Sequence, residues 1–316
     1  MENFLQSLKK AELHLHLEGS VEPETVLELD PTLSPEDVRG KYEFSDFAGF
    51  IRSYVWVNRL LRTPAHYGLI ARRLLERLAA QNVTYAEINL SVGVILWKEQ
   101  DFFGIYRAIS EEASRSPVEV RWIFDAVRQF GAEPAQRVAD LAIELRDDGV
   151  VGFGIGGDEK AGPAGWFRPL FAEVKEYGLA LVPHAGETDG ADSIWACVEM
   201  GADRIGHGIR AADDPELMAH LRDRRIPLEV CITSNVRTGA VPSLEAHPVR
   251  VLYEAGVLIT LNSDDPAIFG CSLTSEFQLA SDKFGFSSEE LQGIAENAFR
   301  FSRATAAKRA VPPGSR

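Results

Sequence analysis

Short apolar runs alternate along the chain with longer amphipathic stretches. The runs are rich in β-branched and aliphatic residues and have the length of buried strands. Between them, apolar residues recur with the helical period, as in residues 67–80 and 215–224. The pattern predicts eight strands, most of them followed by a helix, that begin at Ala11, Val83, Val118, Val150, Leu179, Asp203, Ile226 and Gly256.

A strand followed by a helix, repeated along the chain, predicts a parallel α/β sheet, because each parallel connection needs a crossover. Eight units in 316 residues match the number in a closed (β/α)₈ TIM barrel. Gly149, Gly178, Gly201 and Gly256 stand just before predicted strands, where helix C-caps are expected. The alternative is an open doubly wound sheet, which we disfavour because no glycine-rich phosphate-binding turn follows the first strand.

The interval between the first two predicted strands is longer than the others. It contains an amphipathic stretch at residues 46–61, DFAGFIRSYVWVNRLL. We therefore expect a helical insertion after the first strand, at about residues 20–80, that covers the barrel mouth as a lid. No linker, repeat or low-complexity tract interrupts residues 1–316, so we expect a single metal-dependent hydrolase barrel domain.

The amino-acid composition argues against some classes of binding partner. The chain has 47 acidic and 33 basic residues and a formal net charge of -14, which argues against a nucleic-acid partner. The apolar runs are too short to span a bilayer and the first residues show no signal-peptide pattern, so we expect a cytoplasmic protein with no membrane partner. Cys197, Cys231 and Cys271 form no CxxC pair, so neither a disulfide framework nor a thiolate zinc site is predicted.

Residues capable of metal binding gather at the C-terminal ends of the predicted strands, which in a barrel meet at the catalytic face. The first strand carries His14 and His16, two positions apart and therefore on one side of the strand. On an edge strand they would face water, whereas inside a closed barrel two imidazoles need hydrogen bonds or a metal. We interpret them as metal ligands. His66, His220 and His247 lie in helical or loop segments away from this face, and we assign them no role.

The fifth and eighth strands complete a ligand set. His184 ends the fifth strand, and Asp264 and Asp265 end the eighth. The alternative for the aspartates is local, because Ser-Asp-Asp-Pro is also typical of a helix N-cap. Together with His14 and His16, His184 and Asp264 would form a three-histidine, one-carboxylate set that suits Zn²⁺ with water in an open position. Such a water ionises near neutral pH and becomes a nucleophile.

Two further strand-end residues are candidates for catalysis. Glu187 lies three residues after His184, where the alternative is a glutamate favoured by a helix N-terminus. A buried carboxyl beside the attacked atom can give or take a proton. His207 lies between two glycines that allow close approach of a ligand. Gly157 would present a bare backbone amide to a ligand, although a plain turn explains this glycine nearly as well.

With these motifs the chain resembles the adenosine deaminase family, a branch of the metal-dependent amidohydrolase barrels, along nearly its whole length. The resemblance implies hydrolytic removal of the amino group from C6 of a 6-aminopurine, with release of ammonia. It rests on the motifs HLHLEG (14–19), GDE (157–159), HAGE (184–187), GHG (206–208) and SDDP (263–266).

Residue by residue, the resemblance implies roles for the strand-end side chains. Glu187 would donate a proton to purine N1, which makes C6 electrophilic, and His207 would position the attacking hydroxide. Asp265 would contact the imidazole side of the purine, and the Gly157 amide would contact N3. One Zn²⁺ per chain is implied, because the fourth strand offers no lysine to bridge two metals; its ligands would be His14, His16, His184 and Asp264.

Two positions depart from the adenosine enzymes of the family, which have Asp where this chain has Glu18 and Gly154. The first Asp meets the ribose 5′-hydroxyl, so we expect Glu18 to contact the substrate differently. Glutamate there is found in adenine deaminases and in members resembling aminodeoxyfutalosine deaminases, whose substrate carries a carboxyphenyl group that Arg59, Arg62 or Arg237 would pair with.

The stretch SNVRTG, residues 234–239, resembles the nucleoside branches more than the adenine branch. We therefore expect the small-molecule partner to be a 6-aminopurine nucleoside, of the adenosine or 6-amino-6-deoxyfutalosine type. One alternative is an adenine deaminase that acts on the free base. The other is a catalytically silent purine-binding relative, which the complete set of predicted ligands and proton-transfer residues disfavours.

Overall fold

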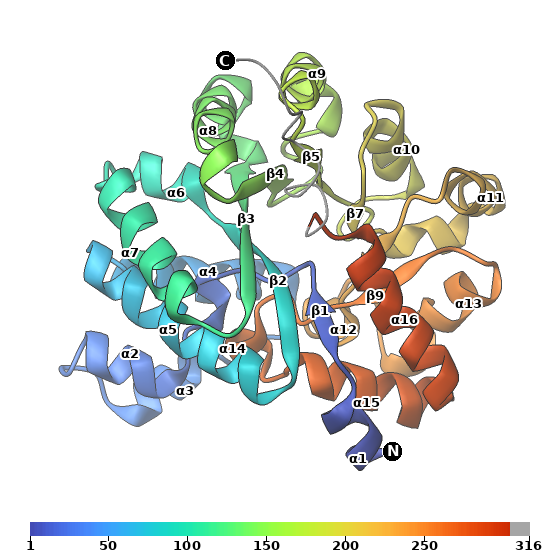
Figure 1. Cartoon of the computed structure of the whole chain (residues 1–316), viewed down its shortest axis with the longest axis horizontal. Helices are drawn as coiled ribbons and strands as arrows, with labels where there is room; N and C mark the ends of the chain where they lie inside the picture. The colour runs from blue at the N-terminus through green and yellow to red at the C-terminus, as the bar shows by residue number, and fades with distance from the viewer. Residues whose placement is uncertain (304–316) are drawn as a thin grey trace, which may run out of the picture.

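Parallel strands form the centre of the molecule and helices surround them in the computed structural model, which describes residues 1–303 (Figure 1). Hydrogen bonds join the strands in the orders β1-β2-β3-β4-β5 and β6-β7-β8-β9, and every pair is parallel. The strands are β1 (Lys10–Glu12), β2 (Val83–Leu90), β3 (Glu119–Val127), β4 (Val150–Gly156), β5 (Ala180–Leu181), β6 (His184–Ala185), β7 (Ile205–His207), β8 (Leu228–Val230) and β9 (Ile259–Leu261).

Strands β5 and β6 are two parts of one barrel strand, because only Val182 and Pro183 separate them. Proline has no amide hydrogen and therefore interrupts the ladder. Pairing continues on both sides of it: Val182 N donates to Phe153 O at 3.0 Å, and Gly206 N donates to Pro183 O at 2.9 Å. The nine short segments are therefore eight barrel strands, in the order that the sequence predicts.

The seam between the first and last strands differs from the predicted continuous strand through His14 and His16. Strand β1 ends at Glu12, because the Oδ1 atom of Asn262 accepts the backbone amides of Leu13 and His14, at 3.0 and 3.1 Å, in place of a backbone carbonyl. Beyond that point the chain pairs only through isolated bridges, Leu15 with Asp264 and His16 with Asn89. The bridges close the ring, so the (β/α)₈ barrel prediction is confirmed while its first strand is shorter than predicted.

Helices cover the outside of the ring (Figure 1). The helix predicted at 215–224 matches α11, and that at 67–80 lies within α5. Gly149, Gly178, Gly201 and Gly256 all have positive φ, from 79° to 108°, as the C-cap prediction requires. The helices outside the insertion are α1 (Glu2–Ser7), α6 (Val92–Trp97), α7 (Phe102–Arg115), α8 (Ala132–Glu144), α9 (Arg168–Glu176), α10 (Ala191–Glu199), α11 (Pro215–Arg224), α12 (Ile232–Arg237), α13 (Val249–Glu254), α14 (Pro266–Phe269), α15 (Leu273–Phe284) and α16 (Ser288–Phe301).

Four helices fill the long interval between β1 and β2. They are α2 (Pro23–Leu29), α3 (Pro35–Lys41), α4 (Phe47–Leu60) and α5 (Pro64–Ala80). Side chains cap the N-termini of three of them. Ser34 and Asp37 form a capping box on α3, Asp46 accepts the Gly49 amide of α4 at 2.6 Å, and Thr63 accepts the His66 amide of α5 at 3.3 Å. Helix α4 contacts α14, which follows the last strand. The insertion therefore reaches across to the catalytic end of the barrel.

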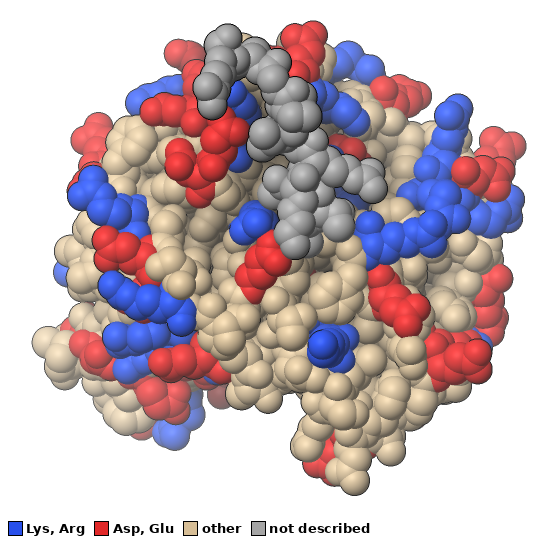
Figure 2. All heavy atoms as spheres, in the orientation of Figure 1, with Lys and Arg blue, Asp and Glu red and all other residues tan. Residues whose placement is uncertain are grey.

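The surface carries charges of both signs. On the face that Figure 2 shows, Lys and Arg are interspersed with Asp and Glu around the periphery. Among the described residues, no helix is both long and apolar enough to cross a membrane.

Candidate active site

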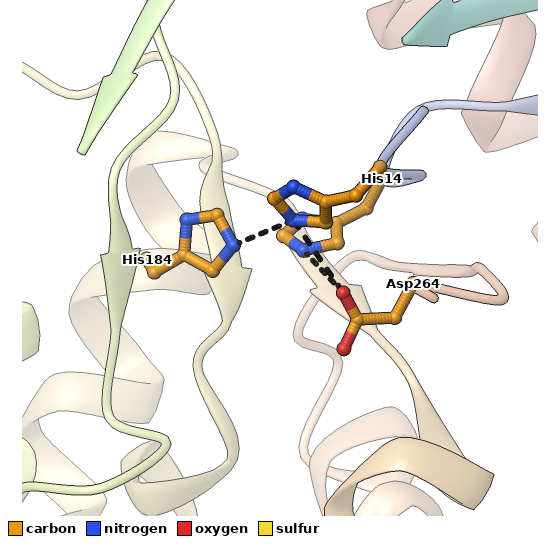
Figure 3. A group of neighbouring side chains, drawn as sticks. His14, His184 and Asp264 are labelled. Atoms are coloured by element: carbon orange, nitrogen blue, oxygen red, sulfur yellow. Dashed lines mark hydrogen bonds and ion pairs between the residues drawn. The ribbon is translucent and has the colours of Figure 1, made fainter. Parts of the chain in front are cut away.

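Four side chains from the first, fifth and eighth barrel strands converge at the C-terminal end of the barrel. His14, His184 and Asp264 point toward one another (Figure 3). The Nε2 atoms of His16 and His184 lie 3.1 Å apart, and Asp264 Oδ1 lies 3.5 Å from Nε2 of both His14 and His16. One ligand atom from each of the four residues lies within 4.8 Å of the others. The structure thus brings the predicted ligands together.

The chemistry of this cluster fits a metal ion. The Nε2 atom of His14 is buried and has no hydrogen-bond partner within residues 1–303, which is costly unless something else binds it. Burial lowers the pKa of His16 to about 3 and that of His184 well below its usual value, so both rings are neutral, as metal ligands must be. Three imidazole nitrogens and one carboxylate oxygen are a donor set that zinc takes.

A buried ion-pair network orients His14. The ring Nδ1 donates to Glu229 Oε2 at 2.9 Å, and Arg204 Nε donates to Glu229 Oε1 at 2.5 Å and pairs on its other side with Glu87. Although burial alone would raise it, the positive charge of Arg204 lowers the pKa of Glu229. Although burial alone would lower it, the hydrogen bonds and charges of Asp264 and Glu229 raise the pKa of His14 to about 10. In the neutral ring, Glu229 holds the proton on Nδ1, which leaves Nε2 free for a metal. Sequence reasoning missed this network, although ionisable residues inside apolar strands β2 and β8 were a signal.

Asp264 is held in a conformation that few residues adopt. Its φ is 62°, in the left-handed region, and His207 at the end of β7 has φ of 60°. Such strain is concentrated at functional sites. Ser234 Oγ donates to Asp264 Oδ2 at 2.6 Å, which leaves Oδ1 toward the histidines. Asp265 is the N-cap residue of α14 but makes no side-chain cap bond, so the local N-cap alternative does not account for this pair.

Glu187 and His207 face each other beside the cluster. Glu187 Oε2 lies 3.6 Å from His207 Nε2, which is 3.9 Å from Asp264 Oδ2. Asn235 Nδ2 donates to His207 Nδ1 at 3.1 Å, so the ring proton lies on Nε2 and points toward both carboxyls. Burial lowers the pKa of His207 to about 4, and burial with the nearby Asp264 charge raises the pKa of Glu187 well above its usual value. The site therefore combines a neutral imidazole with a carboxyl whose protonated form is favoured.

His247, to which we assigned no role from the sequence, belongs to this arrangement. It is buried, and its Nε2 donates to Asn235 Oδ1 at 3.2 Å. This bond fixes the orientation of the Asn235 amide and hence the tautomer of His207. The assignment of His247 to a position away from the site is corrected accordingly.

Glu159, the last residue of the GDE motif, holds the loop that carries Glu187. Its carboxylate accepts the backbone amides of Gly186, Glu187 and Thr188, at 2.8, 2.9 and 2.8 Å, together with the hydroxyl of Ser193. Sequence reasoning used the motif only as a mark of resemblance. The structure shows that this glutamate organises the loop.

Two motif glycines make room for site residues. A Cβ atom on Gly19 would lie 1.6 Å from Oδ1 of Asp265, and one on Gly206 would lie 2.7 Å from Cε1 of His14. Both distances are shorter than any real contact, so the two positions exclude other residues while these side chains stay in place. Packing therefore explains Gly19 of HLHLEG and Gly206, the first glycine of GHG.

A cavity opens above the cluster. The empty space inside it, counted out into the solvent at its open mouth, is about 850 Å³. His16, His184, Glu187, His207 and Asp264 line its polar end. Helix α4 contributes an apolar side, with Phe47, Phe50, Ile51, Tyr54 and Val55. The remaining lining residues are Ser91, Val94, Asp125, Val127, Gln129, Phe130, Gly156, Gly157 and Asp265.

Comparison with known proteins identifies the family to which this site belongs. The sequence profile described as adenosine deaminase matches residues 9–311. The chain belongs to the adenosine deaminase family. Its members are hydrolytic deaminases, and this chain is accordingly an enzyme of that type, as the resemblance of its motifs predicts.

Several known proteins are similar to this chain over almost its whole length. An aminodeoxyfutalosine deaminase from Streptomyces avermitilis is 39% identical over 325 aligned positions, which cover 98% of this chain and 90% of that protein. The structure of an adenine deaminase from Arthrobacter aurescens has a TM-score of 0.89 at 30% identity and covers 96% of each chain. An amidohydrolase from Burkholderia ambifaria with bound Zn has a TM-score of 0.89 at 25% identity, over 98% of this chain and 91% of that one.

Glu18, the residue that departs from the adenosine enzymes of the family, lies behind the cavity wall. Its carboxylate accepts the Ser91 amide at 3.1 Å and the Tyr54 hydroxyl at 3.4 Å, and Tyr54 also bonds Ser91 Oγ at 2.6 Å. Tyr54 and Ser91 line the cavity, whereas Glu18 itself does not. Burial raises the pKa of Glu18 to about 7. In this structure Glu18 therefore reaches the cavity through Tyr54 and Ser91.

The three arginines considered as partners of a substrate carboxylate do not line the cavity. Arg59 and Arg62 are exposed. Arg237 donates to the carbonyl of Tyr42 at 3.1 Å and lies over the ring of Phe44, 4.8 Å from its centre. A substrate carboxylate would have to reach beyond the cavity, or α4 would have to move, to meet any of them.

Proposed function

We propose that the chain is a zinc-dependent aminohydrolase that replaces the 6-amino group of a 6-aminopurine nucleoside by oxygen and releases ammonia. One observation carries the proposal: the cluster of His14, His16, His184 and Asp264 faces Glu187 and His207 at the polar end of one cavity. When bound there, zinc supplies activated water for attack at neutral pH.

Glu187 and His207 would handle the protons of this reaction. The raised pKa of Glu187 favours the protonated form of its carboxyl, which can donate to purine N1 and make C6 electrophilic. His207 presents an N–H at Nε2, 3.6 Å from Glu187 and 3.9 Å from Asp264. That N–H would orient the attacking oxygen and stabilise the negative charge that develops on it.

Asp265 and Gly157 would fix the plane of the purine. The Oδ1 atom of Asp265 is buried without a hydrogen-bond partner among the described residues, and burial raises the pKa of this carboxyl well above its usual value. A protonated Asp265 can donate to purine N7, which is an acceptor. The Gly157 amide, held at a φ of 103°, would meet N3. Contacts at N1, N3 and N7 would place C6 at the metal.

The apolar side of the cavity favours a nucleoside over the free base. Phe47, Phe50, Ile51 and Val55 of α4 form this side, and they would offer contacts in addition to those that the purine makes at the polar end. The apolar side chains of α4, which we propose as a lid, would cover the sugar and whatever the ribose 5′-carbon carries. The similarity to an aminodeoxyfutalosine deaminase supports a substrate of this extended kind.

Adenine is the second candidate substrate, favoured by the likeness to a solved adenine deaminase. The test is kcat/KM of the zinc-loaded protein on aminodeoxyfutalosine, adenosine and adenine, followed by ammonia release. We expect a nucleoside to exceed adenine by at least about tenfold. If adenine exceeds both nucleosides, the enzyme is an adenine deaminase; if none of the three reacts, the proposed function is wrong.

A further inference from the structure

Asp125, near the end of β3, is a buried carboxylate to which the deamination chemistry assigns no role. It is 5% exposed and lines the cavity. Its Oδ1 atom is buried and has no hydrogen-bond partner within residues 1–303. Burying an unpaired carboxylate oxygen is costly unless a donor arrives from elsewhere. The cavity is where such a donor would come from.

The neighbouring strand is shaped around this carboxylate. Gly154 and Gly156 on β4 lie beside it, and a Cβ atom would come within 2.9 Å of Asp125 Oδ1 at the first position and within 2.8 Å of Oδ2 at the second. Both approaches are closer than real Cβ atoms make. Two glycines therefore leave space for the Asp125 side chain at the cavity wall.

The nearby cation does not satisfy Asp125. Arg128 is fully buried, and its guanidinium donates to the backbone carbonyls of Gly162, Ile155 and His184. Burial raises the pKa of Asp125 to about 7, in spite of the positive charge of Arg128. A hydrogen-bond donor on the ligand would supply the partner that Asp125 Oδ1 lacks among the described residues.

We propose that Asp125 is a specificity-determining residue that accepts a hydrogen bond from a donor on the N9 side of the purine. In a nucleoside the donor is a ribose hydroxyl, and in the free base it is the N9–H group. The inference rests on the proposed function, which places purine N3 at the Gly157 amide. Purine N3 and N9 are both bonded to ring atom C4, so N9 and its substituent lie beside N3. Asp125 packs against Gly156, the neighbour of Gly157, and therefore lies on this side of the purine.

The experiment measures kcat/KM of wild type, Asp125→Ala and Asp125→Asn on matched substrates. The nucleoside set is aminodeoxyfutalosine, adenosine, 2′-deoxyadenosine and 3′-deoxyadenosine, and the free-base set is adenine and 9-methyladenine. We expect Asp125→Ala to lower kcat/KM on the best substrate by about 10- to 100-fold. The same variant should react equally with adenosine and the deoxyadenosine that lacks the contacted hydroxyl, or equally with adenine and 9-methyladenine. Asp125→Asn, which keeps an acceptor oxygen, should lie between the two.

Controls separate this contact from a structural role. Glu119→Gln removes a carboxylate from the exposed beginning of the same strand and should behave as wild type. Zinc content and Tm of the Asp125 variants should stay near the wild-type values. The Asp125 assignment alone is overturned if Asp125→Ala has the wild-type kcat/KM on the best substrate. It is also overturned if the variant distinguishes the compounds within each set as strongly as wild type does. A wild-type enzyme inactive on all six compounds overturns the proposed function, and this assignment with it.

Discussion

The Nδ1 atom of His14 lies 2.9 Å from Oε2 of Glu229, a carboxylate that is fully buried on strand β8. Arg204 on the other side of Glu229 keeps that carboxylate charged. In a neutral ring, donation from Nδ1 leaves Nε2 unprotonated and able to bind a metal. The orientation of one proposed metal ligand therefore depends on Glu229 and Arg204, which lie outside the group of His14, His16, His184 and Asp264.

Replacing Glu229 by glutamine should weaken zinc binding. The amide cannot fix the His14 tautomer as a carboxylate does, so the zinc dissociation constant should rise by about 10- to 100-fold. Competition with a chromophoric chelator measures it. Glu276→Gln, which alters a buried carboxyl on α15 that hydrogen-bonds Thr233, is the control and should bind zinc as wild type does. Equal affinity in the Glu229 variant would show that the network does not act on the metal.

Glu187→Gln should abolish most of the turnover without releasing the metal. Glutamine retains the shape of the side chain but cannot transfer a proton, so kcat should fall by about 10²- to 10⁴-fold. Steady-state rates and zinc content measured on the same preparation test this. Asp189→Asn, the same change of charge two residues along the same loop, should keep its activity. Wild-type turnover in the Glu187 variant would remove it from the mechanism.

The sequence predicts the first residues of strands β2, β3 and β4 to within one residue, because a mostly apolar run begins at each of them. It overestimates the first strand and does not show the break in the fifth. Those deviations arise from the Asn262 side chain and from Pro183, whose effect depends on which strand lies beside them.

The proximity of His14, His16, His184 and Asp264 was predictable because each lies at the C-terminal end of a predicted strand, and barrel topology brings those ends together. The residues that orient these side chains were not predictable from the sequence. Arg204 is 25 residues from Glu229 and 117 residues from Glu87 in the chain, and only the folded barrel makes them neighbours. The contact of His247 with Asn235 was missed for a similar reason, since a histidine in a loop carries no strand-end signal.

Gly19→Ala should damage catalysis through Asp265. The added methyl group would occupy the position of the Asp265 carboxylate, with Cβ 1.6 Å from Oδ1. A displacement of about 1 Å at a substrate-positioning residue can cost about 10²-fold in rate, and kcat/KM should fall by at least that factor. Gly40→Ala in α3, where a Cβ meets nothing within 4 Å, is the matched control and should retain full activity. Comparable kcat/KM for both variants would contradict the packing argument.

Glu276 should make stability depend on pH. Burial raises the pKa of this carboxyl from about 4.5 to about 7, so the folded state holds the proton more tightly than the unfolded state. The contribution to stability is fully present below pH 4.5 and is lost as pH rises through 7. Relative to Glu276→Gln, the free energy of unfolding of wild type should fall by on the order of 3 kcal/mol between these limits. Denaturant unfolding at pH 5 and pH 8 measures it, and an identical pH dependence in both proteins would refute the assignment.

The central claim is that a single zinc ion, held by three histidines and Asp264, is required for deamination. The most direct measurement is the titration of chelator-treated, metal-free enzyme with zinc while ammonia release from the best nucleoside is followed, with Asp264→Ala in parallel. We predict that wild-type activity rises from near zero and saturates at one zinc per chain, whereas Asp264→Ala gains little activity at any zinc concentration. Full activity without metal, or saturation at two ions per chain, would contradict the account.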